Sequence, residues 1–319
     1  MPDAYIYDAI RLPRARVRKT GGTLAEIPPY ELFGQLLVAL ESRSISADSV
    51  DDILVGISTA VREQGGNLAR AAALWAGWPD RVPGGVVSRL CCSGLDAVES
   101  AAARVAAGYA DVMVAGGVES MSRVPMLSDR PAIVTDADLS ERTGFVTIGV
   151  SADLTAAASF GITRVELAAY AVRSHQKATA ALTSESMVPV RKGDTVLLDA
   201  DEGARADATS AAFAALPALF GDDPAWQRVA RRLPGSPRPA DGPHTITTAP
   251  QLADGAAAVV HAHGRRTRAG HHSRGPRARV RRGAAALELK EHICPSPCPA
   301  QLFPLPKRGR LCKFVIPRR

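Results

Sequence analysis

The sequence predicts an α/β fold, and three observations support this prediction. Short apolar runs of strand length alternate with segments whose apolar residues recur at helical spacing. A loop-rich stretch interrupts the alternation, which then returns once before residue 262. No internal repeat is present. Alternating strands and helices are typical of a layered fold with mostly parallel strands.

The predicted elements follow one another closely in the first part of the chain. Strands are expected in four apolar runs, at residues 3–10, 51–58, 83–90 and 111–117. Helices are expected at residues 31–45, 67–77 and 93–108, the first with Leu32, Leu36, Leu37 and Leu40 at helical spacing. The last helix is expected to bury one face and to end at Gly108; that face comprises Leu95, Val98, Ala102 and Val105.

These patterns divide the chain into four regions. Residues 1–118 form an N-terminal α/β domain, and residues 119–243 form an inserted loop subdomain whose clearest helix is at 162–182. Residues 244–262 return to the first domain with an alanine- and valine-rich strand. Residues 263–319 alternate Arg, Pro, Gly and His without a period, which predicts a disordered tail.

Charge is distributed unevenly between these regions. The net charge is +7, but residues 263–319 hold 15 basic and two acidic residues, which leaves residues 1–262 at −6. The start of the chain has no apolar run of the kind a secretory signal needs, and no uncharged segment approaches the length of a membrane span. Five scattered cysteines do not resemble a disulfide framework. We therefore expect a soluble cytoplasmic protein.

The adjacent cysteines of SRLCCSGLDAV lie where a strand should turn into a helix. The unpaired N–H groups and positive dipole end of a helix N-terminus favour a thiolate at Cys91, and they could also hold a developing oxyanion. Ser93 and Gly94 would allow a tight turn. The residues alone leave two interpretations of Cys91 open, a catalytic nucleophile or a buried structural cysteine. Cys92 is expected to be a small packed residue.

The same run resembles the nucleophile motif of the thiolases, N-R-x-C-[A/S/G]-S-G-L. Further collinear stretches are similar to other motifs of that family, namely DAIRLPRARVRK, VREQGGNLARAAAL, AGGVESMSRVP, AAYAVRSHQKA, DEGARADAT and QLADGAAAVV. Among the thiolases, these motifs are most similar to those of the fatty-acid-degrading 3-ketoacyl-CoA thiolases. The resemblance implies a thiolase-like fold over residues 1–262.

The resemblance also implies a reaction. Cys91 would attack the ketone of a 3-ketoacyl-CoA, acetyl-CoA would leave, and the thiol of a second CoA would take the acyl group from the enzyme. Coenzyme A is then a substrate, and no cofactor or metal is implied. Arg205, in DEGAR, lies where the family commonly contacts CoA, although Asp201 and Glu202 could equally be its ion-pair partners. A homo-oligomer without membrane or specific nucleic-acid partners is expected.

Three motifs of the family's second half are absent from this sequence. They are G-H-P-x-G, whose His serves as a base, C-x-G-G-G, whose Cys moves protons, and N-E-A-F, whose Asn helps build an oxyanion site. The string Gly270-His271-His272 does not match the first, and no later cysteine precedes glycines. Ser88 and the run 246–250 also depart from the family pattern. We expect the C-terminal half of the fold to be missing and activity to be impaired.

Each remaining motif has a non-functional interpretation beside the functional one. Zinc binding by His292, Cys294, Cys298 and Cys312 has a spacing that fits no common finger. The Arg-rich run 265–282 lacks interleaved aromatic residues, so a non-specific polycation is favoured over a nucleic-acid site. Glu119 is expected to anchor the loop after its strand. His175 and His244 are expected to be ordinary polar or capping residues.

Two other classes of function stay open beside the acyltransferase. One is a non-catalytic remnant that binds acyl-CoA or pairs with an intact thiolase subunit, and the other is a nucleic-acid-associating protein driven by the tail. The composition changes at once after Ala262, to residues that G/C-rich codons encode in any frame. We therefore predict that the tail results from a shifted reading frame.

Overall fold

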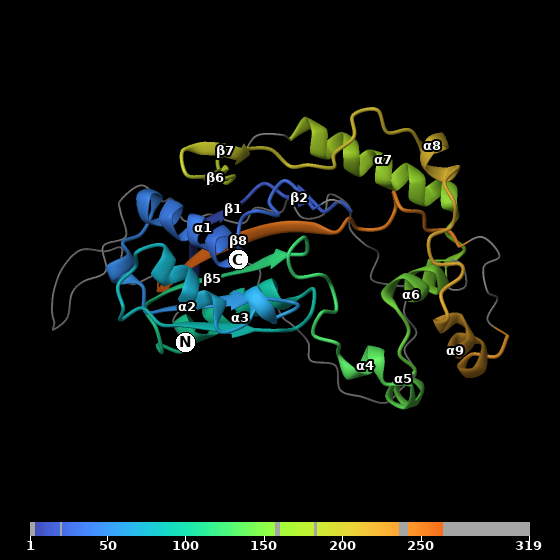
Figure 1. Cartoon of the computed structure of the whole chain (residues 1–319), viewed down its shortest axis with the longest axis horizontal. Coiled ribbons are helices and arrows are strands. Elements are labelled where there is room, and N and C mark those ends of the chain that lie inside the picture. The colour runs from blue at the N-terminus through green and yellow to red at the C-terminus, as the bar shows by residue number, and fades with distance from the viewer. Residues whose placement is uncertain (1–3, 20, 157–159, 182–183, 236–241, 264–319) are drawn as a thin grey trace, which may run out of the picture. The chain divides into compact units, whose positions relative to one another are not determined.

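The computed structural model describes residues 4–19, 21–156, 160–181, 184–235 and 242–263 of the chain. Its central element is a mixed β-sheet (Figure 1). The order along this sheet is β1 (Ala4–Arg11), β8 (Ala253–His263), β5 (Val112–Ser120), β3 (Asp52–Gly56) and β4 (Gly84–Val87), and the short β2 (Ala15–Arg16) pairs with β8. All five predicted strands are therefore present.

The direction of β8 differs from the prediction of mostly parallel strands. Strands β3, β4 and β5 are parallel to one another, but β8 runs antiparallel to both of its neighbours, β1 and β5. Ser120 at the end of β5 pairs with Asp254 at the start of β8. Because the chain re-enters the sheet at the end where β5 left it, β8 must run in the opposite direction.

Helices cover both faces of this sheet. Helices α1 (Pro29–Arg43) and α2 (Leu68–Trp75) share a buried cluster with Ile53, Val55 and Val114. The neighbouring strand residues Leu54, Met113 and Ala115 pack instead with α3 (Ser93–Ala106). Since successive strand residues point to opposite faces, α3 lies on the face opposite α1 and α2.

The buried face of α3 agrees with the predicted one at Val105 but differs from it at Leu95. Ser93, Ala97, Ala101 and Val105 are buried against the sheet, whereas Leu95 is 61% exposed. The spacing of four residues places small side chains in the contact and lets the helix approach the strands closely. The larger apolar residues of α3 were a misleading signal, because here close approach favours small side chains over large ones.

The loop subdomain contains short elements and one long helix. Its helices are α4 (Ala132–Thr135), α5 (Ala137–Thr143), α6 (Ile148–Leu154), α7 (Arg164–Ala180), α8 (Ser210–Ala214) and α9 (Ala225–Arg232). Strands β6 (Val190–Lys192) and β7 (Thr195–Leu198) form a hairpin, and the 3₁₀ turns η1 (Ala47–Ser49) and η2 (Arg62–Gln64) belong to the first domain. Helix α7 confirms the predicted helix and starts with a capping box between Thr163 and Glu166.

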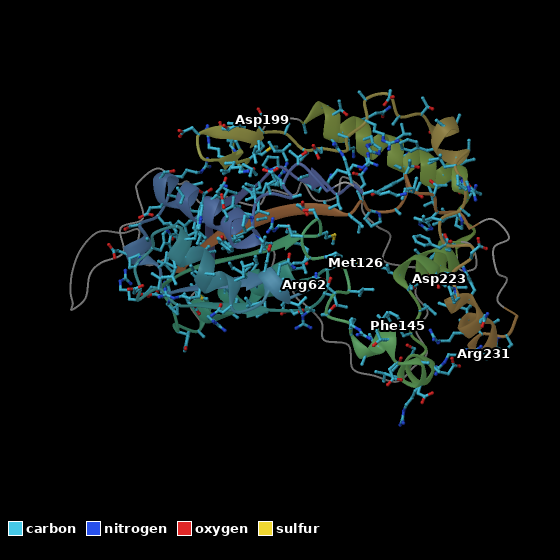
Figure 2. All side chains as sticks on the ribbon, viewed as in Figure 1. Arg62, Met126, Phe145, Asp199, Asp223 and Arg231 are labelled. Atoms are coloured by element: carbon cyan, nitrogen blue, oxygen red, sulfur yellow. The ribbon has the colours of Figure 1, made fainter. Side chains whose placement is uncertain are left out.

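Small apolar clusters hold these elements. Phe213 of α8 packs on Ala168 and Val172 of α7, and Trp226 and Val229 of α9 pack on Val150 of α6. Polar contacts add to the second cluster. Phe145, Asp223 and Arg231, all labelled in Figure 2, lie in this part of the chain, where Asp223 accepts a hydrogen bond from Thr147 Oγ1 (2.8 Å) and Arg231 pairs with Glu141.

Candidate functional site

The candidate site is the turn between β4 and α3, which carries Cys91. Leu90, directly before it, has a φ of +49°, a conformation that bulky residues rarely adopt. The N–H of Cys92 donates to the carbonyl of Arg89 (3.1 Å), and that of Ser93 to the carbonyl of Leu90 (3.0 Å). This strained, closed turn presents Cys91 immediately before the N-cap of α3, as predicted.

Ser93 holds the turn from below. Its side chain is buried, and its Oγ accepts a hydrogen bond from the N–H of Arg89 (2.8 Å). The same Oγ lies within hydrogen-bond distance of the carbonyl oxygens of Leu90 (2.5 Å) and Ile57 (3.2 Å). A serine at this position therefore ties the turn both to itself and to the end of β3.

Glycines allow the start of α3 to lie directly on the strand ends. A Cβ on Gly56, the last residue of β3, would overlap the carbonyl group of Ser93. A Cβ on Gly117 of β5 would come within 3.2 Å of the Cα of Gly94. Backbone thus meets backbone here, at the end of β3 and within β5, directly after the turn that carries Cys91.

Both cysteines of the turn are exposed, which makes the prediction for Cys92 wrong. Cys92 is the N-cap of α3, and the packed face of that helix begins only at Ser93, so no neighbour covers it. The exposure of Cys91 favours the nucleophile interpretation over a buried structural cysteine. In the part of the chain that the structure describes, no group forms a hydrogen bond with the Cys91 thiol.

Glu119 anchors the end of β5, in the structural role predicted for it. Its carboxylate accepts hydrogen bonds from the backbone N–H of Ser58 (2.8 Å) and from the side-chain amide of Gln64 (2.7 Å). Gln64 is fully buried, and its Oε1 accepts from the N–H of Ser120 (2.6 Å). With both carboxylate oxygens engaged by the fold, Glu119 is not placed as a general acid.

Arg205 does not lie at the Cys91 turn. It lines one of two neighbouring pockets. One pocket, of about 210 Å³, is lined by Arg16, His175 and Arg205 among others, and the other, of about 240 Å³, by Arg14, Tyr170 and His175 among others. The segment 246–252 contributes to both, so the pockets share a wall. Cys91 lines neither of them.

The two acidic neighbours of Arg205 in sequence are engaged elsewhere. Asp201 forms a bidentate pair with Arg11 (2.8 and 2.9 Å), and Glu202 accepts from Thr23 Oγ1 (2.6 Å) and lies 3.6 Å from Arg18. Burial would raise the pKa of Asp201, but the hydrogen bonds from Arg11 and the backbone of Arg14 lower it overall. Among the described residues no ion pair involves Arg205, so the alternative interpretation of Arg205 as their partner is wrong.

His175 forms the boundary between the pockets. Its Nδ1 accepts a hydrogen bond from the backbone N–H of Arg205 (3.2 Å), and its ring packs edge-on against Phe213. Burial lowers the pKa of His175, and the charges of Arg205 and Arg14 lower it further. A neutral imidazole beside two arginines leaves the positive charge of this site on the guanidinium groups.

His244 has an acidic partner that sequence reasoning missed. Its Nδ1 lies 2.6 Å from Oδ1 of Asp153, a side chain that is fully buried on α6. The two residues are 91 positions apart, and neither stands in a recognisable motif. Only contacts in the folded chain could have shown the pair.

Some predicted features lie outside the described residues. They are the disordered tail at 263–319, except for its first residue, the zinc candidates His292, Cys294, Cys298 and Cys312, and the Arg-rich run 265–282. Within the described ranges no three His, Cys, Asp or Glu side chains are grouped as metal ligands. No helix in those ranges is long and apolar enough to cross a membrane.

Comparison with known proteins gives the family. Residues 5–224 match the domain described as "Thiolase, N-terminal domain". The chain belongs to the thiolase family. The match includes both the Cys91 turn and the segment around Arg205.

Several thiolases are similar to this chain. It is 36% identical over 247 residues to the beta-ketoadipyl-CoA thiolase of Pseudomonas knackmussii, covering 69% of this chain and 60% of that protein. It is 32% identical over 322 residues to the 3-ketoacyl-CoA thiolase of Cronobacter sakazakii, covering 97% and 76%. The crystal structure of the Bacillus anthracis acetyl-CoA acetyltransferase matches with a TM-score of 0.65 at 28% identity, covering 83% and 66%.

The extent of these matches bears on the predicted boundary at residue 262. This thiolase chain spans less than two thirds of the length of the Pseudomonas knackmussii relative. The alignment to the Cronobacter sakazakii protein covers more of this chain than residues 1–262 could supply, so it continues into the tail. The division at residue 262 stays a prediction.

Proposed function

We propose that this chain transfers acyl groups through Cys91, by the thiolase type of reaction. The observation that carries the proposal is the exposed Cys91 thiol on a strained turn before the N-terminus of α3. A helix N-terminus favours negative charge, and its free N–H groups can receive an oxyanion. Membership of the thiolase family supports the same assignment.

The proposed reaction has two halves. The Cys91 thiolate attacks the keto carbon of a 3-ketoacyl-CoA, and the adjacent carbon–carbon bond breaks. The acyl group stays on sulfur, while the electron pair leaves with acetyl-CoA as an enolate that takes up a proton. The thiol of a second CoA then gives up its proton and attacks the thioester, which releases the shortened acyl-CoA and restores the thiolate.

Both halves require a group that moves protons, and this limits the proposed activity. The sequence holds neither the G-H-P-x-G nor the C-x-G-G-G motif. A positioned acid or base typically contributes about 10²–10⁴-fold to a rate. We therefore propose that the chain as printed is an impaired enzyme whose Cys91 can be acylated but turns over slowly.

The pockets around Arg205 are the proposed site for coenzyme A. Arg14, Arg16 and Arg205 line them, and arginine is the side chain best suited to phosphate groups. Removing the guanidinium of Arg205 should therefore weaken CoA binding. The substrate class proposed is a 3-ketoacyl-CoA, since the relatives of this chain include 3-ketoacyl-CoA thiolases. A homo-oligomer in the cytoplasm acting in fatty acid β-oxidation is the proposed setting.

Acylation and turnover of the purified chain test this proposal. After incubation with acetoacetyl-CoA, peptide mass spectrometry should find an acetyl group on Cys91 in the wild type and in Cys92→Ala, but not in Cys91→Ala. Steady-state thiolysis should be several orders of magnitude below an ordinary rate of about 10 s⁻¹. Acetylation of Cys92 instead, or none, would remove the nucleophile assignment. An ordinary rate would mean that the missing groups are supplied elsewhere.

A non-catalytic remnant is the second candidate, favoured by the Cys91 thiol having no hydrogen-bonded base among the described residues. Such a protein would bind acyl-CoA, or pair with an intact thiolase subunit, without acylation. Calorimetric CoA binding by Cys91→Ala that equals the wild type, together with an absence of acyl-enzyme in both, would favour this candidate.

A further inference from the structure

The buried carboxylate of Asp153 on α6 forms two hydrogen bonds with His244. Its Oδ1 lies 3.1 Å from the backbone nitrogen of His244 and 2.6 Å from the ring Nδ1. A single oxygen of Asp153 therefore contacts both the backbone and the ring of His244. Asp153 is fully buried, and His244 keeps 15% of its side chain exposed.

The surroundings of Asp153 leave it little freedom. A Cβ on Gly242 would overlap Oδ2 of Asp153, so the backbone at residue 242 closes directly over the carboxylate. Within the described residues Oδ2 has no hydrogen-bond partner. Burying a carboxylate costs free energy when only one of its oxygens is hydrogen-bonded. Packing alone does not offset this cost.

The chain that follows His244 forms the wall shared by the two pockets. Thr245 is buried, and its carbonyl accepts from the N–H groups of Thr248 (3.0 Å) and Ala249 (3.1 Å). Thr247 in this turn lines both pockets, opposite His175 of α7. The turn is closed by its own hydrogen bonds, but these do not determine where it lies relative to α7.

Contacts at both ends place the turn: the carbonyl of Leu252 accepts from the N–H of Val17 (3.1 Å) at the far end, and His244 anchors the near end. Besides the two contacts to Asp153, its carbonyl accepts from the N–H of Leu219 (2.9 Å). Arg164, at the start of α7, donates to the carbonyl of Gly242 (2.8 Å). His244 is therefore the last anchored residue before the turn, and Asp153 supplies two of its three hydrogen bonds.

We propose that Asp153 and His244 are positioning residues for coenzyme A, which hold residues 245–252 as the shared wall of the Arg205 pockets. The inference rests on the proposed function, in that these pockets are taken as the CoA site. Neither residue needs to touch CoA. Releasing the anchor would let the turn move away from His175 and widen the site.

Variants of Asp153 test the proposal, with CoA as the probe and calorimetry as the measurement. Asp153→Ala should raise the Kd about tenfold, equivalent to about 1.4 kcal/mol. Asp153→Asn keeps an acceptor oxygen of the same size at Oδ1, so its Kd should stay within about threefold of the wild type. His244→Leu, which removes the ring contact, should follow Asp153→Ala.

A control variant separates positioning from general loss of stability. Thr147→Val removes the hydrogen bond to Asp223 at the N-terminal end of α6, and should lower the melting temperature without changing the Kd. An equal loss of affinity in Thr147→Val, or wild-type affinity in Asp153→Ala, would overturn the proposal. If Asp153→Ala does not fold, His244→Leu carries the same test.

Hydrogen exchange separates this inference from the proposed function. Amide exchange of Thr248 and Ala249 should accelerate in Asp153→Ala while exchange in β5 and β8 stays as in the wild type. If the wild type does not bind CoA, the proposed function and the CoA part of this inference both fail. Exchange at residues 245–249 that does not change in Asp153→Ala would show that the anchor itself is wrong, whether or not CoA binds.

Discussion

At the scale of single residues, the two adjacent cysteines differ in position but not in exposure. Both thiols are open to solvent, and Cys92 caps α3 while Cys91 lies one residue earlier, directly after the strained Leu90. Cys92 is therefore an internal control for any property assigned to Cys91. A difference between the two cannot be explained by burial.

Alkylation of the folded protein exploits this control. As the proposed nucleophile, Cys91 should be modified by iodoacetamide faster than Cys92 and faster than the three later cysteines. Time-resolved peptide mass spectrometry measures the five rates in one sample. Equal rates at both adjacent cysteines, or protection of Cys91, would count against its role as nucleophile.

The surroundings of His175 lead to a second prediction, which concerns how the stability of the protein depends on pH. Burial and the charges of Arg205 and Arg14 lower its pKa below the ordinary value of about 6.5. The folded state then binds fewer protons than the unfolded state in this range, so the contribution of His175 to stability is present above the ordinary pKa. It is lost as the pH falls through the lowered pKa.

Urea unfolding at a series of pH values checks this sign. Between about pH 7.5 and 5, the free energy of unfolding should fall more steeply in the wild type than in His175→Asn, which does not titrate. The buried His261, whose pKa burial also lowers, is present in both proteins and cancels in the difference. Parallel pH profiles would contradict the placement of His175.

At the scale of elements, the contact between β3 and α3 places the turn. Gly56 at the end of β3 meets the backbone of Ser93, and Ala97, Ala101 and Val105 continue the contact along the helix. A side chain at residue 56 would have to push α3 off the sheet, since its nearest neighbours are backbone atoms rather than flexible side chains. The position of Cys91 therefore depends on residue 56 being a glycine, which has no Cβ.

Gly56→Ala should destabilise the protein by about 1–3 kcal/mol, the usual cost of overpacking. Gly85→Ala on the neighbouring strand β4 is the matched control, because its Cβ would meet only Leu54 at an ordinary 3.5 Å. That control should be unchanged or up to about 1 kcal/mol more stable. Urea midpoints compare the three proteins, and equal midpoints for both variants would refute the close contact.

At the scale of the whole molecule, the turn and α3 present apolar surface. Leu90 and Leu95, on either side of Cys91, are each 61% exposed in the described part of the chain. Exposed apolar residues that gather around a functional group indicate a surface that another layer covers. We therefore expect the chain to depend on a partner that covers this surface.

The nucleotide sequence tests the origin of the tail. If residues after Ala262 come from a shifted frame, one of the two other frames downstream of that codon should encode G-H-P-x-G and C-x-G-G motifs in that order. A designed chain with the frame restored should then show much faster thiolysis than this chain. If neither frame holds the motifs, the tail needs a function of its own.

The sequence by itself determined the family and the order of elements, and it predicted Cys91 as the nucleophile. Collinear motifs around Cys91, Glu119 and Arg205 could be recognised because each is a short local string, and helix α7 because its period and capping box are local too. The strands were found for the same reason. A pattern that is confined to a short run of consecutive residues can be recognised in the sequence without knowledge of the fold.

Only the tertiary structure decided the faces and the long-range partners. Leu95 points away from the sheet because glycines on β3 and β5 bring α3 too close for a large side chain. Cys92 is exposed because it is the N-cap and precedes the packed face of α3. The partner of His244 lies 91 residues away at Asp153, and the direction of β8 depends on where the loop subdomain returns the chain. Such contacts join segments without a shared local pattern, so they exist only once the chain has folded.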